Sequence, residues 1–181
     1  GGSVYLRLST RPLRQLERKI DDDLKGQIIS GGYWRIRPSP AAPFVLVYCG
    51  VIAEEVEEAF KRVKTDEPGA GLLAITSPDR LYSDWQASLL DPEINVGEGG
   101  TSMIESLLKG IPQSAILITV IDGHPATLAW LGSVLGHRVL PMGVSEFGQS
   151  GDIIDLYNFY GIDSDSVVNM VAKACLKYIG R

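Results

Sequence analysis

The sequence predicts an α/β protein in three layers, with helices on both faces of a mixed, mostly parallel sheet of about five strands. Short apolar runs alternate along the chain with segments of helical periodicity, which is the order expected for such folds. Two runs, Phe44–Cys49 and Ala115–Ile121, are largely apolar, as is typical of strands covered on both faces. The connection from Tyr33–Arg37 to Phe44–Cys49 holds three prolines and no helical segment. Those two strands must therefore run antiparallel, and this makes the sheet mixed.

The expected strands are short and are bounded by glycine, proline or polar turns. They are Tyr33–Arg37, Phe44–Cys49, Gly71–Thr76, Ala115–Ile121 and His137–Met142.

The expected helices follow from periodicity and from cap signals. Leu16, Ile20, Leu24 and Ile28 recur every four residues, which predicts a first helix that Gly31 ends. Ser77-Pro78-Asp79 supplies a hydroxyl cap, a first-turn proline and an acid at the positive end of a later helix. Thr101 or Ser102 is expected to cap another. The predicted helices span residues 15–29, 52–63, 78–91, 102–109, 125–135, 152–160 and 164–179.

Composition excludes several classes of function. The net charge of −5 argues against a general nucleic-acid binder, which needs a basic face. The basic residues Arg14, Arg18 and Lys19 are followed by acids, so we interpret them as one solvated helix face. The sequence contains no apolar run of about 20 residues, the length of a membrane span, so we expect a cytoplasmic protein without membrane contact. Cys49 and Cys175 lie far apart in apolar segments, which predicts reduced core thiols.

The segment Phe147–Asp152 follows the last strand and opens a helix, where a small anion could bind to backbone N–H groups. The simpler interpretation is a tight turn in which Ser150 or Asp152 caps the helix. Because Gly151 follows Ser150 directly, the segment is not a nucleophile elbow. The glycine-rich stretch Gly97–Ser102 lacks the lysine of a P-loop, which favours a mobile loop over a phosphate cradle.

Asp122 and His124 follow the most apolar strand and could serve acid–base chemistry. The sequence offers no nucleophile beside them, and a polar turn packed at an interface explains them as well. His137 completes no recognisable metal-binding spacing. The aromatic residues of the last third are expected in the core or at a subunit interface; they are Trp130, Tyr157, Phe159 and Tyr160.

The last third of the chain has a recognisable order. Leu140–Asp152 includes a Phe147-Gly148-Gln149-Ser150 turn, and a Tyr160-Gly161 break precedes a helix that contains Val167-Val168. This order resembles the third, C-terminal domain of transketolase-type enzymes, which bind thiamine diphosphate.

Other segments carry the same resemblance. Val4–Arg11 resembles the last strand of the preceding pyrimidine-binding domain and its exit linker. Gly71–Leu81 and Asp84-Trp85 are similar to the middle of the C-terminal domain in homodimeric pyruvate dehydrogenase, the decarboxylating first component of that complex. The resemblance therefore implies that residues 1–14 end one domain and that residues 15–181 form a transketolase C-terminal-like domain.

The resemblance implies a parent enzyme that holds thiamine diphosphate and Mg²⁺ between its other domains, at a dimer interface. In the pyruvate dehydrogenase case, the resemblance implies that the enzyme decarboxylates a 2-oxo acid, pyruvate, and passes the acyl group to a lipoyl-bearing acyltransferase. The family's catalytic glutamate and its Gly-Asp-Gly diphosphate motif belong to those other domains. We therefore assign no catalytic, cofactor or metal residue to this chain, and expect it to be inactive alone.

The family's third domain contributes dimer contacts and borders the substrate entrance. The residues that we expect at this border or interface are Asp122, His124, Glu146, Phe147, Gln149 and Ser150. We also expect exposed apolar surface and dimer formation, because the strand Val4–Leu8 would lack its native neighbours. Two alternatives stay open: the C-terminal domain of a transketolase, and a stand-alone α/β module that binds a small anion at Gly148–Asp152.

Overall fold

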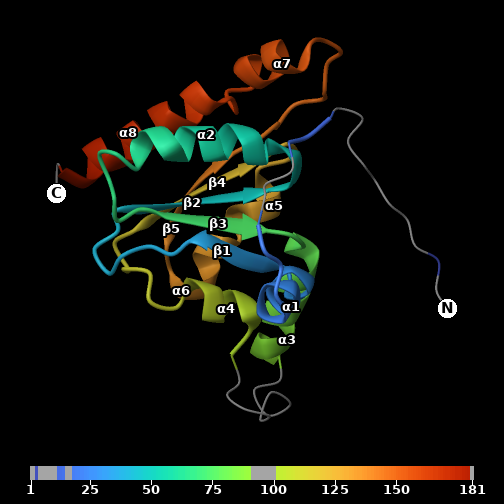
Figure 1. Ribbon diagram of the computed structural model, residues 1–181, viewed down its shortest axis with the longest axis vertical. Coiled ribbons are helices and arrows are strands. Elements are labelled where there is room, and N and C mark those ends of the chain that lie inside the picture. The colour runs from blue at the N-terminus through green and yellow to red at the C-terminus, as the bar shows by residue number, and fades with distance from the viewer. Residues whose placement is uncertain (1–2, 4–11, 15–17, 91–100, 180–181) are drawn as a thin grey trace.

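A mixed five-stranded sheet forms the centre of the molecule in the computed structural model, which describes residues 3, 12–14, 18–90 and 101–179 (Figure 1). The strand order is β1-β3-β2-β4-β5. β1 is antiparallel to β3, and the other neighbouring pairs are parallel. The α/β class and the mixed, mostly parallel sheet are thus confirmed. The strands are β1 (Gly32–Ile36), β2 (Phe44–Cys49), β3 (Gly71–Ile75), β4 (Ile116–Ile121) and β5 (Arg138–Met142).

β1 and β2 run in opposite directions, as the helix-free connection predicts, but they are not neighbours. β3 lies between them and pairs with both, Gly32 facing Ile75 on one side and Val45 facing Gly71 on the other. This insertion places β2 at the centre of the sheet, where neither of its edges is open.

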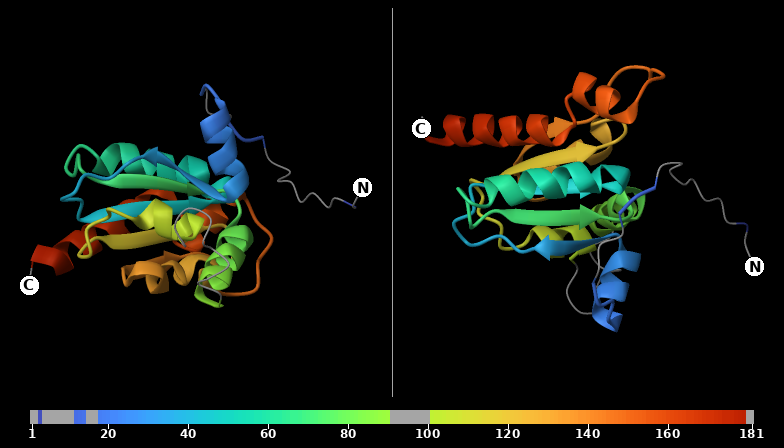
Figure 2. Two further views of the ribbon diagram at one scale, coloured as in Figure 1. Left: turned by 90° about the horizontal axis from the view of Figure 1, so that it is seen from below. Right: turned by 45° about the horizontal axis from the view of Figure 1, so that its top comes forward.

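Helices cover both faces of the sheet (Figures 1 and 2). α2 and α8 pack on one face, and α3, α4, α5 and α6 pack on the other. The side chains of β2 alternate accordingly, with Phe44 and Leu46 in the first core and Val45 and Val47 in the second, all fully buried. Burying such a side chain contributes about 1.5–3 kcal/mol. The helices are α1 (Asp22–Ser30), α2 (Ala53–Val63, after the 3-10 turn Gly50–Ile52), α3 (Pro78–Leu90), α4 (Met103–Leu108), α5 (Ala126–Ala129), α6 (Leu131–Leu135), α7 (Ile153–Phe159) and α8 (Ser164–Ile179).

The first helix is shorter than predicted. The expected start at Gln15 is wrong: residues 18–21 are not helical, α1 begins at Asp22, and residues 15–17 lie outside the described part. Asp21 has an extended backbone, and its carboxylate accepts the N–H of Leu24 at 2.9 Å. This cap stops the helix from extending backwards, although the apolar spacing continues. The predicted stop is confirmed, since Gly31 ends α1 with φ at +117°.

The segment predicted as one helix over 125–135 is two short helices. Trp130 stands between them, its ring stacked on Trp85 at 5.4 Å between centroids. A Cβ atom at Gly132 would lie 2.7 Å from the carbonyl oxygen of His137, so α6 contacts the backbone that leads into β5. The stack holds Trp130 against Trp85, and the close approach at Gly132 holds α6 against the chain before β5.

Other local predictions are confirmed. Ser102 and Glu105 form a capping box at α4. Cys49 and Cys175 are free and half-buried, packed against cores on opposite faces of the sheet. Burial raises the pKa of the Cys49 thiol to about 11. Among the described helices, none is long and apolar enough to cross a membrane.

Candidate functional site

The carboxyl ends of β2, β3, β4 and β5 meet at one edge of the sheet. The chain leaves β2 through α2 on one face to reach β3, and it leaves β4 through α5 and α6 on the other face to reach β5. β2 and β4 are neighbours, so their connections diverge between Cys49 and Ile121. Ligands of α/β proteins bind preferentially at such a switch point.

A hollow of about 350 Å³, the Asp122 pocket, lies on the β4–β5 side of this switch point. Asp122 and Gly123 line it from the turn after β4, Glu146 and Gln149 from the segment after β5, and Tyr157 from α7. The pocket thus joins two of the turns that the sequence singles out.

Direct contacts hold these turns together. The hydroxyl of Tyr157, a core residue, donates a hydrogen bond to Asp122 Oδ2 at 2.9 Å. The N–H of Val144 donates to the carbonyl of Gly123 at 2.8 Å. A Cβ atom at Gly143 would lie 2.5 Å from that same carbonyl oxygen, so the contact between the two turns requires glycine.

The structure brings together three of the six residues predicted for the border. Asp122, Glu146 and Gln149 line the pocket, whereas His124, Phe147 and Ser150 do not. His124, Phe147 and Ser150 lie outside the pocket, and His124 has a different structural role.

His124 Nδ1 accepts the N–H of Ala126 at 3.2 Å, so this imidazole serves the start of α5. Phe147 is 97% exposed, and Ser150 is exposed as well. Asp152 caps α7 by accepting the N–H of Ile154 at 3.0 Å, as one of the two predicted cap residues.

The chemistry of the Asp122 pocket is that of a hydrogen-bond acceptor. Asp122 and Glu146 give it two carboxylates, and no lysine or arginine is among its described lining residues. Carboxylates repel an anion at this position. Within the described ranges, no group of three or more His, Cys, Asp or Glu residues could hold a metal ion. The glycine-rich stretch Gly97–Gly100 lies outside those ranges.

An apolar patch borders the pocket. Phe159 is 66% exposed, and its ring meets that of Tyr160 edge-on at 5.1 Å between centroids. The Tyr160 hydroxyl donates to the carbonyl of Phe147 at 3.4 Å, which ties the turn to the helix. We name Phe147, Ile153, Ile154 and Phe159 the α7 patch. Exposed apolar side chains are thus present on the described surface, as expected, whereas the strand Val4–Leu8, on which the expectation also rested, lies outside the described residues. Among the predicted core or interface aromatics, Tyr157 is core and Phe159 is exposed.

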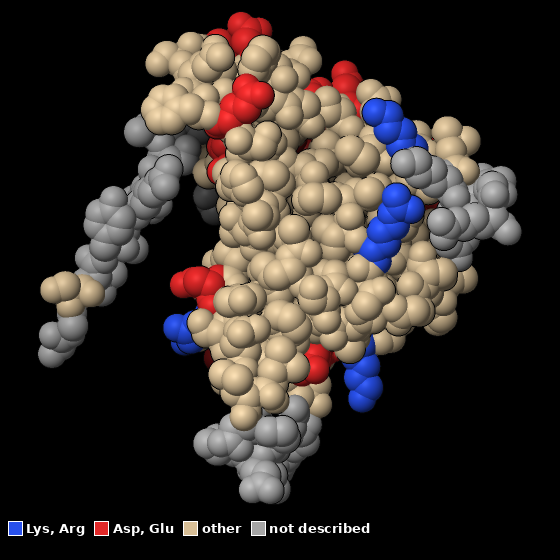
Figure 3. Space-filling model, turned by 180° about the vertical axis from the view of Figure 1, so that it is seen from behind, with Lys and Arg blue, Asp and Glu red and all other residues tan. Residues whose placement is uncertain are grey.

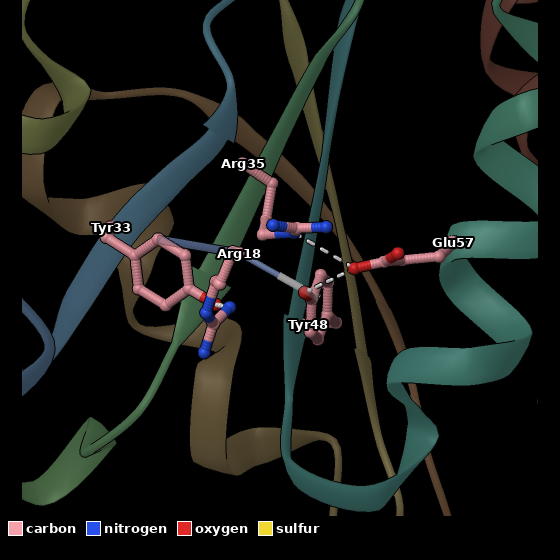
Figure 4. Close-up of polar contacts among 5 residues, drawn as sticks. All are labelled: Arg18, Tyr33, Arg35, Tyr48 and Glu57. Atoms are coloured by element: carbon pink, nitrogen blue, oxygen red, sulfur yellow. Dashed lines mark hydrogen bonds and ion pairs between the residues drawn. The ribbon is translucent and has the colours of Figure 1, made fainter. Parts of the chain in front are cut away.

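Sequence reasoning missed a polar network at the other side of the switch point (Figure 4). Glu57 Oε1 accepts hydrogen bonds from the Tyr48 hydroxyl at 3.1 Å and from Arg35 Nε at 3.0 Å. The Arg18 guanidinium donates to the Tyr33 hydroxyl and lies 5.0 Å from the centre of that ring. Burial, and then the charge of Glu57, raise the pKa of Tyr48.

One signal could have indicated this network. Tyr48 is the single hydroxyl in an otherwise apolar buried strand, and a buried hydroxyl needs a partner. The interpretation of Arg14, Arg18 and Lys19 as one solvated helix face is wrong for the described residues, because Arg14, Arg18 and Lys19 are not helical.

Comparisons with known proteins bear on the fold. No family model matches the sequence, and no curated protein matches it. Solved transketolase structures match at low identity. The transketolase of Leishmania mexicana is 15% identical, with a TM-score of 0.57 over 86% of this chain and 19% of its own. A Pichia stipitis transketolase variant in complex with fructose 6-phosphate is 18% identical, with a TM-score of 0.57 over 86% of this chain and 19% of its own.

A further neighbour is a split-gene transketolase, described as an inactive tetramer of beta subunits. It is 16% identical, with a TM-score of 0.54 over 79% of this chain and 41% of its own. The chain spans about a fifth of the full-length transketolases that it matches. It has the α/β fold of the transketolase C-terminal domain.

Proposed function

We propose that residues 15–181 form the C-terminal domain of a thiamine-diphosphate enzyme of the transketolase group, and that residues 1–14 are the end of a preceding domain and its linker. One observation carries the proposal: the fold matches the Leishmania mexicana transketolase over 86% of this chain but over only 19% of that one. The remaining domains of the parent chain would then bind thiamine diphosphate and Mg²⁺.

The domain is proposed to be inactive alone. Among its described lining residues, the Asp122 pocket has carboxylates but no serine, threonine, cysteine or lysine. The His124 imidazole serves a helix start elsewhere. A reaction centre needs an acid, base or nucleophile placed together around a substrate. The neighbouring split-gene transketolase, described as inactive, is in keeping with a chain that requires other parts.

The proposed role is assembly. The α7 patch exposes four large apolar side chains beside the Asp122 pocket. The side of the molecule turned away from the viewer in Figure 1 also carries few charged side chains (Figure 3). Both features favour contact with other domains or with a second subunit. The Asp122 pocket would then border the substrate entrance of a homodimer.

Two parent reactions are supported by different observations. The resemblance of Gly71–Leu81 and Asp84-Trp85 supports the pyruvate dehydrogenase component, which would decarboxylate pyruvate and acylate the lipoyl arm of an acyltransferase. However, Trp85 is in the core, and Asp84 accepts the N–H of Met103 at 2.7 Å. Their roles in the fold suffice to explain both residues, whichever substrate the parent uses. The matching solved structures support a transketolase instead.

The third possibility, an anion module at Gly148–Asp152, is disfavoured by charge. Gly148 and Gln149 share the pocket with Asp122 and Glu146. An anion there would lie close to two carboxylates.

The test is to express the complete reading frame with and without residues 15–181. Thiamine diphosphate and Mg²⁺ are added. Turnover is measured separately for pyruvate, with a lipoyl domain as the acyl acceptor, and for fructose 6-phosphate, with an aldose phosphate as the acceptor of the two-carbon group. We expect turnover of one substrate, lost when the domain is deleted, and none from the 181-residue chain alone. Turnover by the isolated chain would contradict the proposal, as would a complete reading frame without a Gly-Asp-Gly diphosphate motif.

A further inference from the structure

The Asp122 pocket carries negative charge that the described part of the chain does not neutralise. The ion pairs formed among the described residues involve neither Asp122 nor Glu146. No lysine or arginine is among the described residues that line the hollow. A positively charged group that entered it would therefore meet two carboxylates and, within the described lining, no competing cation.

The Asp122 carboxylate is oriented by the core. Tyr157 is 3% exposed, and its hydroxyl donates to Asp122 Oδ2 at 2.9 Å. The hydrogen bond from the Val144 N–H to the carbonyl of Gly123 holds the turn that carries Asp122 against the chain after β5. A group that is oriented before binding loses less entropy when a ligand arrives. Asp122 thus differs from an acid on an open, mobile surface.

Apolar side chains form the rest of the lining. A Cβ atom at Gly151 would lie 3.4 Å from the side chain of Leu156, so the segment after β5 lies directly against α7. The Tyr160 hydroxyl donates to the carbonyl of Phe147 and ties the same segment to the end of that helix. The volume of about 350 Å³ is within the range of small-molecule sites, about 300–1,000 Å³. The apolar and aromatic lining residues are Val144, Ile153, Leu156, Tyr157 and Tyr160.

This combination of groups suits a primary ammonium ion on a short carbon chain. An ammonium group has three N–H donors and accepts nothing, so it can serve several acceptor oxygens at once. Asp122, Glu146 and the amide oxygen of Gln149 are acceptors in the lining. A quaternary ammonium ion has no N–H donor and is recognised by aromatic cages. Here the ring of Tyr157 belongs to the core, which leaves Tyr160 as the other aromatic residue in the described lining.

We propose that the Asp122 pocket binds a small primary amine in its ammonium form, with Asp122 and Glu146 as charge partners and the apolar lining around the carbon chain. Two acidic side chains on an open surface would not suffice. Here one of them is anchored to the core, and both line a hollow with apolar walls. Amine binding is a property of this chain itself and goes beyond the border role proposed above.

The test titrates the 181-residue chain with 3-methylbutylamine at pH 7 and low ionic strength, because salt screens such contacts. Binding is followed by ¹H–¹⁵N NMR, and we expect saturable shifts of the amides of Gly123, Gly148 and Gln149. Two comparison compounds each lack one feature of the amine. 3-Methylbutan-1-ol has the same carbon chain without the charge, and tetramethylammonium has the charge without N–H donors. Both should bind about tenfold more weakly, the effect of one charged hydrogen bond.

Three variants locate the site. Asp122→Asn keeps an oxygen that can accept the Tyr157 hydroxyl but removes the charge, and it should weaken amine binding about tenfold. Glu146→Gln changes an exposed side chain and should weaken binding several-fold. Asp66→Asn is the matched control, because Asp66 is exposed between α2 and β3, at the opposite end of the sheet, and it should leave binding unchanged. Retained NMR dispersion will show that each variant is folded.

The proposal is overturned if no saturable shift occurs, if the shifts map away from the Asp122 pocket, or if either comparison compound binds as tightly as the amine. It is also overturned if Asp122→Asn and Glu146→Gln both leave binding unchanged, or if Asp66→Asn weakens it as much as Asp122→Asn. Because the titration needs only this chain, a negative result leaves the proposed thiamine-diphosphate parent enzyme to its own test.

Discussion

The α7 patch makes the assembly role testable in the isolated chain. Phe147 is 97% exposed, so its replacement by serine removes apolar surface without opening the core. Fully burying a phenylalanine side chain in an interface contributes about 1.5–3 kcal/mol. In a two-fold symmetric dimer the residue occurs twice, which doubles the effect to about 3–6 kcal/mol. Phe147→Ser should then raise the dimer dissociation constant by about 10²- to 10⁴-fold.

Sedimentation equilibrium over a wide concentration range measures this change directly. Leu176→Ser is the matched control: Leu176 is 70% exposed on α8, outside the patch. Measured at a concentration at which the unmodified chain is monomeric, both variants should unfold in urea within about 0.5 kcal/mol of it, as surface substitutions usually do. The reasoning is refuted if the unmodified chain stays monomeric at high concentration, or if Leu176→Ser weakens association as much as Phe147→Ser.

Three further predictions concern stability. Tyr48→Phe removes the hydroxyl that donates to the half-buried carboxylate of Glu57, and it should lower the free energy of unfolding in urea by about 1 kcal/mol. Tyr82→Phe, at an exposed ring, should leave that free energy unchanged. Ser102→Ala removes the α4 cap and should cost about 1 kcal/mol in the same measurement, while Ser106→Ala, within that helix and exposed, should cost little. Burial lowers the pKa of His137 below its ordinary 6.5, so the native state favours the neutral imidazole. Its stabilising contribution is complete above pH 6.5 and is lost as the pH falls through the native pKa. His137→Gln should therefore flatten the acid side of the curve of unfolding free energy against pH. An unchanged curve would contradict this.

The strands could be predicted closely because their signal is local. β2 spans Phe44–Cys49 as the apolar run indicates. The start of α1 could not be predicted in the same way. Leu16 and Ile20 continue the apolar spacing, but the helix begins only after the cap at Asp21. Ile20 is 58% exposed, so that spacing serves no buried face there.

The Asp122 pocket and the Arg35–Glu57 contact also differ in how far the sequence could predict them. Asp122 and Glu146 follow neighbouring parallel strands, so their proximity follows from strand ends that meet at one edge. The contact of Arg35 with Glu57 could not be predicted from the connections alone. It depends on the strand order, in which β3 separates β1 from β2 while Arg35 still reaches the helix that covers β2.

The Asp122 pocket also constrains what a partner must provide. Covering the Asp122 pocket with another polypeptide would remove water from the Asp122 and Glu146 carboxylates, and a buried charge without a partner is strongly destabilising. Tyr157 supplies one donor to Asp122. A stable interface on the α7 patch therefore requires further hydrogen-bond donors or a cation from the opposite surface. An apolar partner surface would suit the patch but would supply neither a counter-charge nor further donors to these carboxylates. The complementary surface should therefore combine an apolar contact with at least one basic or amide side chain.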